Sequence, residues 1–518
     1  MSLINTQAMK YSCLFRCLLA ALLFSSQTLH AQPPSFIRDS LDGYIRKGLA
    51  DWDIPGLAIV IVKDGQIVMQ KGYGVKDITN TSPVDENTLF MIASNSKLFT
   101  GTALAQLEVQ RKLSLNDKIT RYFPEYRLYE NTTTELVTIR DMLSHRIGTK
   151  TFQGDFTFWN SALTRTEIMN KMRLLKPVGQ FRQDYGYCNS CFLVAGEVIP
   201  KVTGQSWEKY IQDSLLTPLE MTRSTAISAG METKDNVAVP YTTSYTGSLH
   251  RVPYDQWDNL GPAASIISSV SDLSHWLRFQ LDSGRYNGRR IMPFSVLQRT
   301  RDVNISTGSR KSSVYPMHFR GYGLGLFAAD YNGRQIYWHT GGAAGMVSNV
   351  CFVPEENLGI AILTNNDNQN FFEALRYQIL DAYLQVSYVN RSQQFLQSFK
   401  PSQKTQLDEI NVWKQRVKGN KPPLPLSDYT GTYHNDIYGS LNIIIKDNRL
   451  AVRFNGHKNL TAFIDFMDNN NWLLQYDNIE YGIHIIQFQT TDQQVKGVEI
   501  KVNDFVEQDS YKFSKNTE

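Results

Sequence analysis

The stretch Phe90–Leu107, FMIASNSKLFTGTALAQL, carries Ser94 and Lys97 in the spacing Ser-x-x-Lys. Residues three apart on a helix lie on the same face, so Ser94 at a helix start would meet the Lys97 side chain. No residue from Leu98 to Leu107 is charged, which predicts a helix buried among others. Burial disfavours the ammonium and lowers the pKa of a lysine, so Lys97 is a candidate partner for an activated Ser94 hydroxyl.

Two predicted β-hairpins lie on either side of this helix in the sequence. The first joins residues 57–62 to 66–70 through Asp-Gly, and the second joins 347–353 to 358–363. Strands near both ends with helices between them predict one α+β domain, in which the two hairpins share an antiparallel sheet surrounded by helices. The predicted helices are Thr138–His145, Asn189–Val202, Ser271–Leu281 and Phe371–Val386.

The last quarter of the chain has a different pattern. Residues 390–426 are polar and end in Lys-Pro-Pro-Leu-Pro, which indicates a linker between two self-sufficient parts. Beyond it, short apolar strands alternate with turns, and this pattern predicts a small all-β domain, a barrel or a sandwich, over residues 427–518. Of the two, we expect an antiparallel, lipocalin-like barrel. On four of the predicted strands, the alternating apolar side chains are expected to point into the core of this domain. They are Leu441, Ile443 and Ile445, then Leu450, Val452 and Phe454, then Ile483 and Ile485, and later Val498, Ile500 and Val502.

The first 31 residues have the pattern of a secretory signal peptide. Lys10 and Arg16 precede the apolar run 17–24, and polar residues follow up to Ala31. The run is shorter than the ~20 residues of a membrane span, so we expect a cleaved leader, no integral span, and export to the periplasm or the medium. The main domain would then cover residues 32–389.

Composition excludes several other classes of function. A net charge of +4 in 518 residues gives no indication of nucleic-acid binding. Three cysteines remain beyond the leader, too few for a disulfide framework, and Cys188-x-x-Cys191 has no second pair or nearby histidine. The sequence has no Gly-x-Ser-x-Gly, so an α/β-hydrolase is not predicted. It has no His-x-His and no His-Glu-x-x-His, so neither a metal site nor a cofactor is predicted.

Two further motifs complete a candidate site. Tyr187-Cys188-Asn189 gives Tyr-x-Asn directly before a predicted buried helix, unlike the same pattern at Tyr129, Tyr388 and Tyr476. His339-Thr340-Gly341-Gly342 leads into a small-residue run, where a substrate can approach the backbone and an amide can donate to an oxyanion.

Ser-x-x-Lys, Tyr-x-Asn and His-Thr-Gly, in that order, resemble the serine β-lactamase and penicillin-binding protein superfamily. The resemblance covers about residues 36–386 and is greatest for the class C and D-peptidase or esterase branch. Supporting stretches are Asp53-Ile54-Pro55-Gly56, residues 143–148, Gly261-Pro262-Ala263 and residues 322–325. The barrel resembles a domain of unknown function often attached to this family.

The resemblance implies an exported serine hydrolase that acts on a small-molecule or peptide substrate. Ser94 would be the acylated nucleophile and Lys97 its base or hydrogen-bond partner, with Tyr187 relaying protons. Asn189 would hold a substrate amide, and His339 and Thr340 would line the opposite wall. The amides of Ser94 and Gly342 would form the oxyanion hole. Whether Lys97 or Tyr187 is the base stays open, as does the oligomeric state.

This chain departs from the family pattern at His339, which replaces the lysine of Lys-Thr-Gly. A histidine is mostly neutral at pH 7, so it would bind a substrate carboxylate more weakly. Small esters or D-amino acid peptides are therefore favoured over β-lactams. The alternatives are a β-lactamase, a D-alanyl-D-alanine carboxypeptidase, or a catalytically idle binding or scaffold protein of the same fold.

Overall fold

The computed structural model describes residues 32–417 and 420–516. The predicted signal peptide, residues 1–31, lies outside the described residues. The chain divides into two units after Leu41, and the described part of the first, residues 32–41, contains the π-helical turn η1 (Phe36–Ser40). The architecture and the site described below belong to the second unit.

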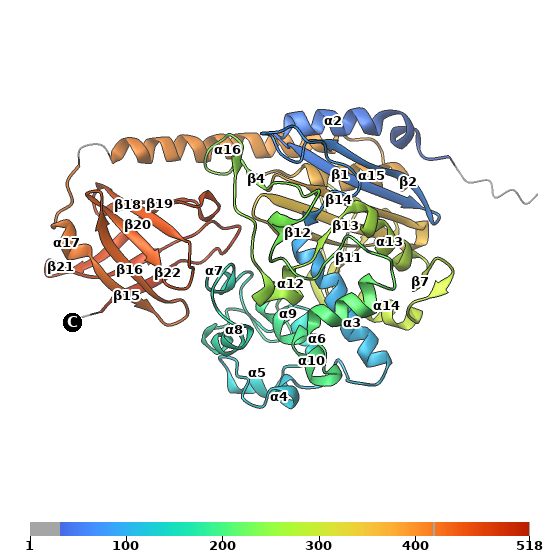
Figure 1. Cartoon of the computed structure of the whole chain (residues 1–518), viewed down its shortest axis with the longest axis horizontal. Helices are drawn as coiled ribbons and strands as arrows, with labels where there is room; N and C mark the ends of the chain where they lie inside the picture. Colours follow the sequence, from blue (N-terminus) through green and yellow to red (C-terminus); the bar gives the residue numbers. More distant parts are fainter. Residues whose placement is uncertain (1–31, 418–419, 517–518) are drawn as a thin grey trace, which may run out of the picture. The chain divides into compact units, whose positions relative to one another are not determined.

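An eight-stranded antiparallel sheet forms the centre of the main domain (Figure 1). Its order is β2-β1-β14-β13-β12-β11-β10-β9. β1 pairs with β14 from Leu57–Thr364 to Lys63–Leu358, so the two predicted hairpins share one sheet, as expected. The strands are β1 (Gly56–Lys63), β2 (Gln66–Gly74), β9 (Ile305–Gly308), β10 (Arg320–Tyr322), β11 (Phe327–Tyr331), β12 (Arg334–Ala343), β13 (Met346–Val353) and β14 (Leu358–Thr364).

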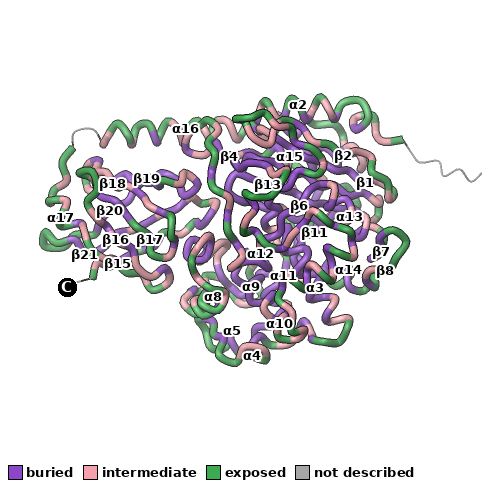
Figure 2. Tube along the Cα trace, in the orientation of Figure 1, coloured by how far each residue is buried: buried purple, intermediate pink, exposed green. Residues whose placement is uncertain are grey.

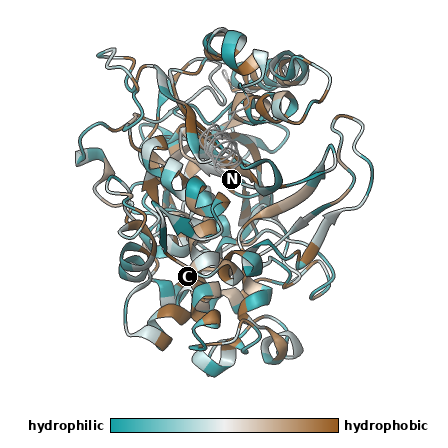
Figure 3. Ribbon diagram, turned by 90° about the vertical axis from the view of Figure 1, so that its right-hand side faces the viewer, coloured by the Kyte–Doolittle hydropathy of each residue, from teal (hydrophilic) through white to brown (hydrophobic). Residues whose placement is uncertain are grey.

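Helices surround this sheet and place the Ser94 segment in the interior. α3 (Ser96–Val109) is buried along most of its length, as the uncharged sequence predicts, and the central strands share its buried surroundings in Figure 2. Many of the outer helices show both brown and teal along their ribbons in Figure 3, as amphipathic helices do. The other helices of five or more residues in this domain are α2 (Leu41–Asp51), α5 (Asn131–Leu136), α6 (Ile139–Leu143), α8 (Arg165–Lys171), α9 (Asn189–Gly196), α10 (Val198–Thr203), α11 (Trp207–Ile211), α13 (Val270–Leu281), α14 (Phe294–Arg301) and α15 (Phe371–Tyr383).

The C-terminal part is a closed eight-stranded antiparallel barrel. Its strands are β15 (Gly431–Asn435), β16 (Gly439–Lys446), β17 (Arg449–Phe454), β18 (Thr461–Asp468), β19 (Asn471–Tyr476), β20 (Ile483–Thr491), β21 (Gln494–Ile500) and β22 (Tyr511–Lys515). The inward prediction is wrong for Ile445, which is 47% exposed near the end of β16. It is also wrong for Ile483 and Ile485. They pack outside the barrel core, whereas Ile486 and Phe488 belong to it.

The predicted linker is largely helical. α16 spans Arg391–Arg416, and Asn390 caps its start by accepting from the Gln393 amide. Ile410 packs with Ile483 and Leu473 of the barrel. This apolar contact explains the outward orientation of Ile483, because the side chain is covered by α16 and not by the barrel interior. No helix among residues 32–417 and 420–516 has the length and apolar character needed to cross a membrane.

Candidate active site

Ser94 lies on a strained turn directly before the buried helix. The 3₁₀ turn η2 (Ala93–Asn95) leads into α3, and Ala93 adopts the left-handed region with φ of 49°. A non-glycine residue in that region costs free energy, so the surrounding contacts must hold it. Asn95 and Ser348 both donate to the Ile92 carbonyl, and the Ile92 amide donates to Ile266. These bonds fix the turn that presents the Ser94 hydroxyl.

Lys97 is fully buried beneath Ser94. Its Nζ lies 2.9 Å from Ser94 Oγ, 2.7 Å from Asn189 Oδ1 and 2.9 Å from the carbonyl oxygen of Ala263. Burial lowers the pKa of Lys97 to about 7. A neutral amine has two N–H groups, which match the Asn189 and Ala263 oxygens. Its lone pair then faces Ser94 Oγ, the geometry needed to accept the hydroxyl proton.

Asn189 is fixed by a buried carboxyl group that the sequence analysis missed. The Asn189 Nδ2 donates to Asp155 Oδ2 at 2.6 Å while Oδ1 accepts from Lys97. Asp155 is 1% exposed, and burial raises its pKa. An amide nitrogen carries two hydrogens, so the second N–H of Asn189 is the one available to a substrate. The position of Asp155, 34 residues before Asn189, carried no motif that would have indicated this contact.

Tyr187 lines the same pocket on the other side of Lys97. The Lys97 Nζ lies 4.7 Å from the centre of the Tyr187 ring, and the His145 ring lies 4.2 Å from it. Burial raises the pKa of Tyr187, an effect partly offset by a hydrogen bond with Ser94. The phenol is therefore protonated at neutral pH. It can donate a proton, whereas Lys97 is the group with a pKa suited to accept one.

The wall opposite Tyr187 is the end of β12. The pairing of β11 with β12 ends at Phe327–Trp338, while β12 continues along β13 to Ala343. From His339 onward, the edge of β12 that faces away from β13 is therefore not covered by β11. His339, Thr340 and Gly342 line the Ser94 pocket along this part of the strand. A Cβ on Gly341 would lie 2.0 Å from the Ile92 carbonyl oxygen, so this glycine allows the strand to approach the nucleophile turn closely.

A hydrogen-bond chain determines the charge of His339. The Cys188 amide donates to His145 Nδ1, so the neutral ring has its proton on Nε2, which lies 3.3 Å from Tyr322 Oη. Tyr322 Oη lies 2.9 Å from His339 Nε2, and His339 Nδ1 lies 2.5 Å from the Thr340 carbonyl. Every donor has an acceptor if both histidines are neutral. The burial of His339 also favours the neutral form, because it lowers the pKa of this histidine to about 3.

The predicted site residues other than Lys97 line one pocket of about 380 Å³, and Lys97 lies behind Ser94. Its described lining contains no Asp, Glu, Lys or Arg side chain. Aromatic rings dominate its walls, so an uncharged and largely apolar group fits it. The lining consists of Ser94, Thr151, Phe152, Trp159, Tyr185, Tyr187, Asn189, Phe327, His339, Thr340, Gly341, Gly342, Val347, Phe372 and Phe505.

The competing copies of the motifs have structural roles. A second Ser-x-x-Lys occurs at Ser206 and Lys209. Ser206 caps α11 by accepting from the Lys209 amide, and the Lys209 side chain pairs with Asp213 at the surface. Tyr129 is 52% exposed and Tyr476 belongs to the barrel core. Neither the second Ser-x-x-Lys nor these tyrosines reach the Ser94 pocket.

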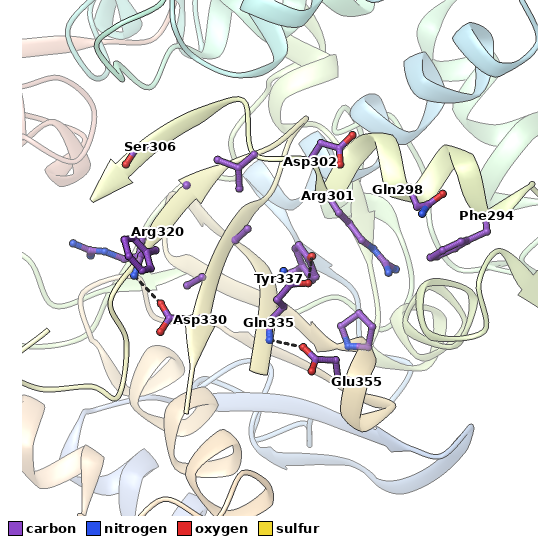
Figure 4. A pocket seen from close by; sticks show the side chains of 16 residues that line it. Phe294, Gln298, Arg301, Asp302, Ser306, Arg320, Asp330, Gln335, Tyr337 and Glu355 are labelled. Atoms are coloured by element: carbon purple, nitrogen blue, oxygen red, sulfur yellow. Dashed lines mark hydrogen bonds between the residues drawn. The ribbon is translucent and has the colours of Figure 1, made fainter. Parts of the chain in front are cut away.

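A larger cavity of about 840 Å³ lies between α14 and the strands β9–β12, away from Ser94 (Figure 4). Its walls carry Arg301, Asp302, Arg320, Asp330 and Glu355. Glu355 accepts from the Gln335 amide and Asp330 from the Phe319 amide, so both carboxylates hold the backbone in place. Ser306 has no lysine or histidine beside it among the described lining residues, so this cavity lacks an activated nucleophile.

Comparison with known proteins agrees with this fold. A family profile described as Beta-lactamase matches residues 41–384. The chain belongs to the beta-lactamase family of serine hydrolases. A second profile, a domain of unknown function (DUF3471), matches residues 415–515, which include the barrel.

Several relatives of this member of the beta-lactamase family have low sequence identity to it. "Protein flp" of Staphylococcus aureus (strain COL) is 27% identical over 352 residues, 66% of this chain and 67% of that protein. "Unguisins hydrolase ungD'" of Aspergillus campestris is 26% identical over 445 residues, 78% of this chain and 77% of that protein. The octameric penicillin-binding protein homologue from Pyrococcus abyssi has a similar fold, with a TM-score of 0.59 and 22% identity, over 92% of this chain and 99% of that one.

Proposed function

We propose that the protein is an exported serine hydrolase that cleaves amide or ester bonds through a Ser94 acyl-enzyme, with small esters or D-amino acid peptides as substrates. The observation that carries this proposal is the buried Lys97, whose Nζ lies 2.9 Å from Ser94 Oγ. Export rests on the leader sequence alone. The neutral wall at His339 and the uncharged pocket lining favour uncharged substrates over those recognised by a carboxylate.

Acylation begins when neutral Lys97 takes the Ser94 proton and Oγ attacks the substrate carbonyl. The resulting oxyanion accepts hydrogen bonds from the amides of Ser94 and Gly342, a contact typically worth 10²–10³ in rate for each donor. Protonated Tyr187 donates its proton to the leaving group, and Lys97 returns a proton to Tyr187. Water then attacks the ester of Ser94, and the same groups act in reverse order to release the acid and restore the hydroxyl.

A screen of the purified chain, residues 32–518, tests this function. The substrates are p-nitrophenyl esters, D-amino acid amides and nitrocefin. We expect turnover of esters or D-amino acid amides, with nitrocefin the poorest substrate. Ser94→Ala should lower kcat/KM at least ~10³-fold. Ser206→Ala, the matched control in the second Ser-x-x-Lys, should stay within ~2-fold, because that serine caps α11. Equal losses in both variants would contradict the assignment of Ser94.

A further inference from the structure

A segment of the barrel forms part of the Ser94 pocket. Residues 501–510 connect β21 to β22, and Phe505 in their middle lines the pocket together with Ser94 and Gly342. A Cβ added to Gly342 would lie 2.7 Å from the Phe505 ring, so the ring packs directly on this glycine. The Trp159 ring is centred 6.0 Å from that of Phe505, and the two ring planes are inclined at 60°.

The barrel holds this segment in a defined conformation. Val502 and Val506, on either side of Phe505, are buried in the barrel core. The Asn503 amide donates to the Tyr481 carbonyl, and Asn503 Oδ1 accepts from the Phe505 amide. Phe505 itself packs against the core of the main domain, not that of the barrel. The turn therefore directs one aromatic side chain out of the barrel.

The main domain is built to receive the segment. Glu507 is 2% exposed and accepts from the amides of Gly154 and Phe156, at 2.8 and 2.9 Å. Phe156 in turn is buried within the barrel core, where its ring stacks on that of Tyr438. Asp155, between the two amides, holds Asn189. The same turn thus receives the barrel segment and supports the catalytic centre, which fixes Phe505 relative to Ser94.

We propose that Phe505 is a specificity-determining residue that packs against an apolar group on the acyl side of the substrate, so that the barrel completes the substrate site. This inference rests on the proposed function. The Gly342 amide holds the oxygen of the scissile carbonyl, and a group on that carbonyl carbon lies beside Gly342, where the Phe505 and Trp159 rings form a corner. Aromatic or branched aliphatic acyl groups fit this corner, since no charged side chain lies in the described lining.

The test varies the acyl group while the leaving group stays constant. We expect Phe505→Ala to lower kcat/KM for p-nitrophenyl phenylacetate by ~10-fold and for p-nitrophenyl acetate by less than ~2-fold, since acetate is too small to reach the ring. Phe505→Leu, which retains an apolar side chain, should lose less. The matched control is Phe463→Ala. Phe463 is a partly buried barrel phenylalanine that packs on Arg449 and does not line the pocket, so neither rate should change.

An unchanged ratio between the two esters in Phe505→Ala, with wild-type melting behaviour, would overturn the inference. In a second series, which keeps the acetyl group and varies the leaving group, a Phe505→Ala loss that grows with the size of the leaving group would overturn the acyl-side assignment. If Phe505→Ala fails to fold, Phe505→Leu decides, because loss of the ring should still lower the phenylacetate-to-acetate ratio in that variant, and an unchanged ratio contradicts the contact. Failure of the proposed function looks different, since the wild type would then hydrolyse none of the esters.

Discussion

The pH dependence of acylation should report the buried Lys97. With a pKa of about 7, about half of the Lys97 side chains are neutral at pH 7, whereas a lysine with the ordinary pKa would be neutral in about one molecule in three thousand. Burial therefore increases the amount of base by about three orders of magnitude. At pH 5 only about 1% would be neutral, so kcat/KM for a neutral ester should lie ~100-fold below its plateau.

The assay follows kcat/KM for one uncharged p-nitrophenyl ester from pH 4.5 to 9, with the spontaneous rate subtracted. We expect a slope of one below about pH 7 and a plateau above it, because Tyr187 and His339 do not titrate in that range. Lys209→Met, in the other Ser-x-x-Lys, should leave the profile unchanged, since that side chain is exposed and pairs with Asp213. A profile that is flat from pH 5 to 8 would refute Lys97 as the base.

Three other changes probe the wall, the core and the barrel. His339→Lys should raise kcat/KM for carboxylate-bearing substrates by ~10-fold, if the new ion pair is worth ~1.4 kcal/mol, and His339→Gln should not; equal effects on neutral esters would contradict a charge effect. Burial raises the pKa of Asp255 to about 6, so the folded protein keeps a proton that the unfolded chain releases between about pH 4 and 6. The stability of the wild type relative to Asp255→Asn, measured by urea unfolding, should therefore fall across that window, and a constant difference would contradict the shift. A chain ending at Val417 loses Glu507 and exposes Phe156, so its melting temperature should fall and its ester kcat/KM should drop at least ~10-fold; a fully active fragment would show that the barrel is dispensable.

The sequence predicted those parts of the molecule that depend on neighbouring residues. The Asp-Gly turn defines the first hairpin, and the uncharged run after Ser94 indicates a buried helix because burial excludes charge. The pairing of Lys97 with Ser94 is also predicted locally, since one helical turn separates the two residues. These features need no knowledge of which distant segments come together.

The missed features depend on contacts between residues far apart in the chain. Tyr322 connects His145 to His339 across 177 and 17 residues, and each residue alone has the pattern of an ordinary core side chain. Glu507 reaches Gly154 across 353 residues. Phe156 is a main-domain residue whose ring is buried in the barrel core, a contact between the two parts that the sequence did not indicate. Apolar periodicity shows that a side chain is buried, but it does not show which core receives it.

The same limit applies to the linker. Its polar composition indicates a linker, yet α16 contacts the barrel through Ile410 and a few neighbours. The Asn390 cap is a local signal in favour of this helix that the sequence analysis does not use.

Covalent labelling at Ser94 tests the central claim most directly. The purified chain is treated with a fluorophosphonate, digested, and analysed by mass spectrometry. We expect one stoichiometric adduct on the peptide that contains Ser94, with labelling slowed ~100-fold at pH 5 because Lys97 is then protonated. The peptide that contains Ser206 should remain unmodified. A chain that is folded yet gains no adduct, or gains it equally at Ser206, would show that the Ser94–Lys97 pair does not act as an activated nucleophile.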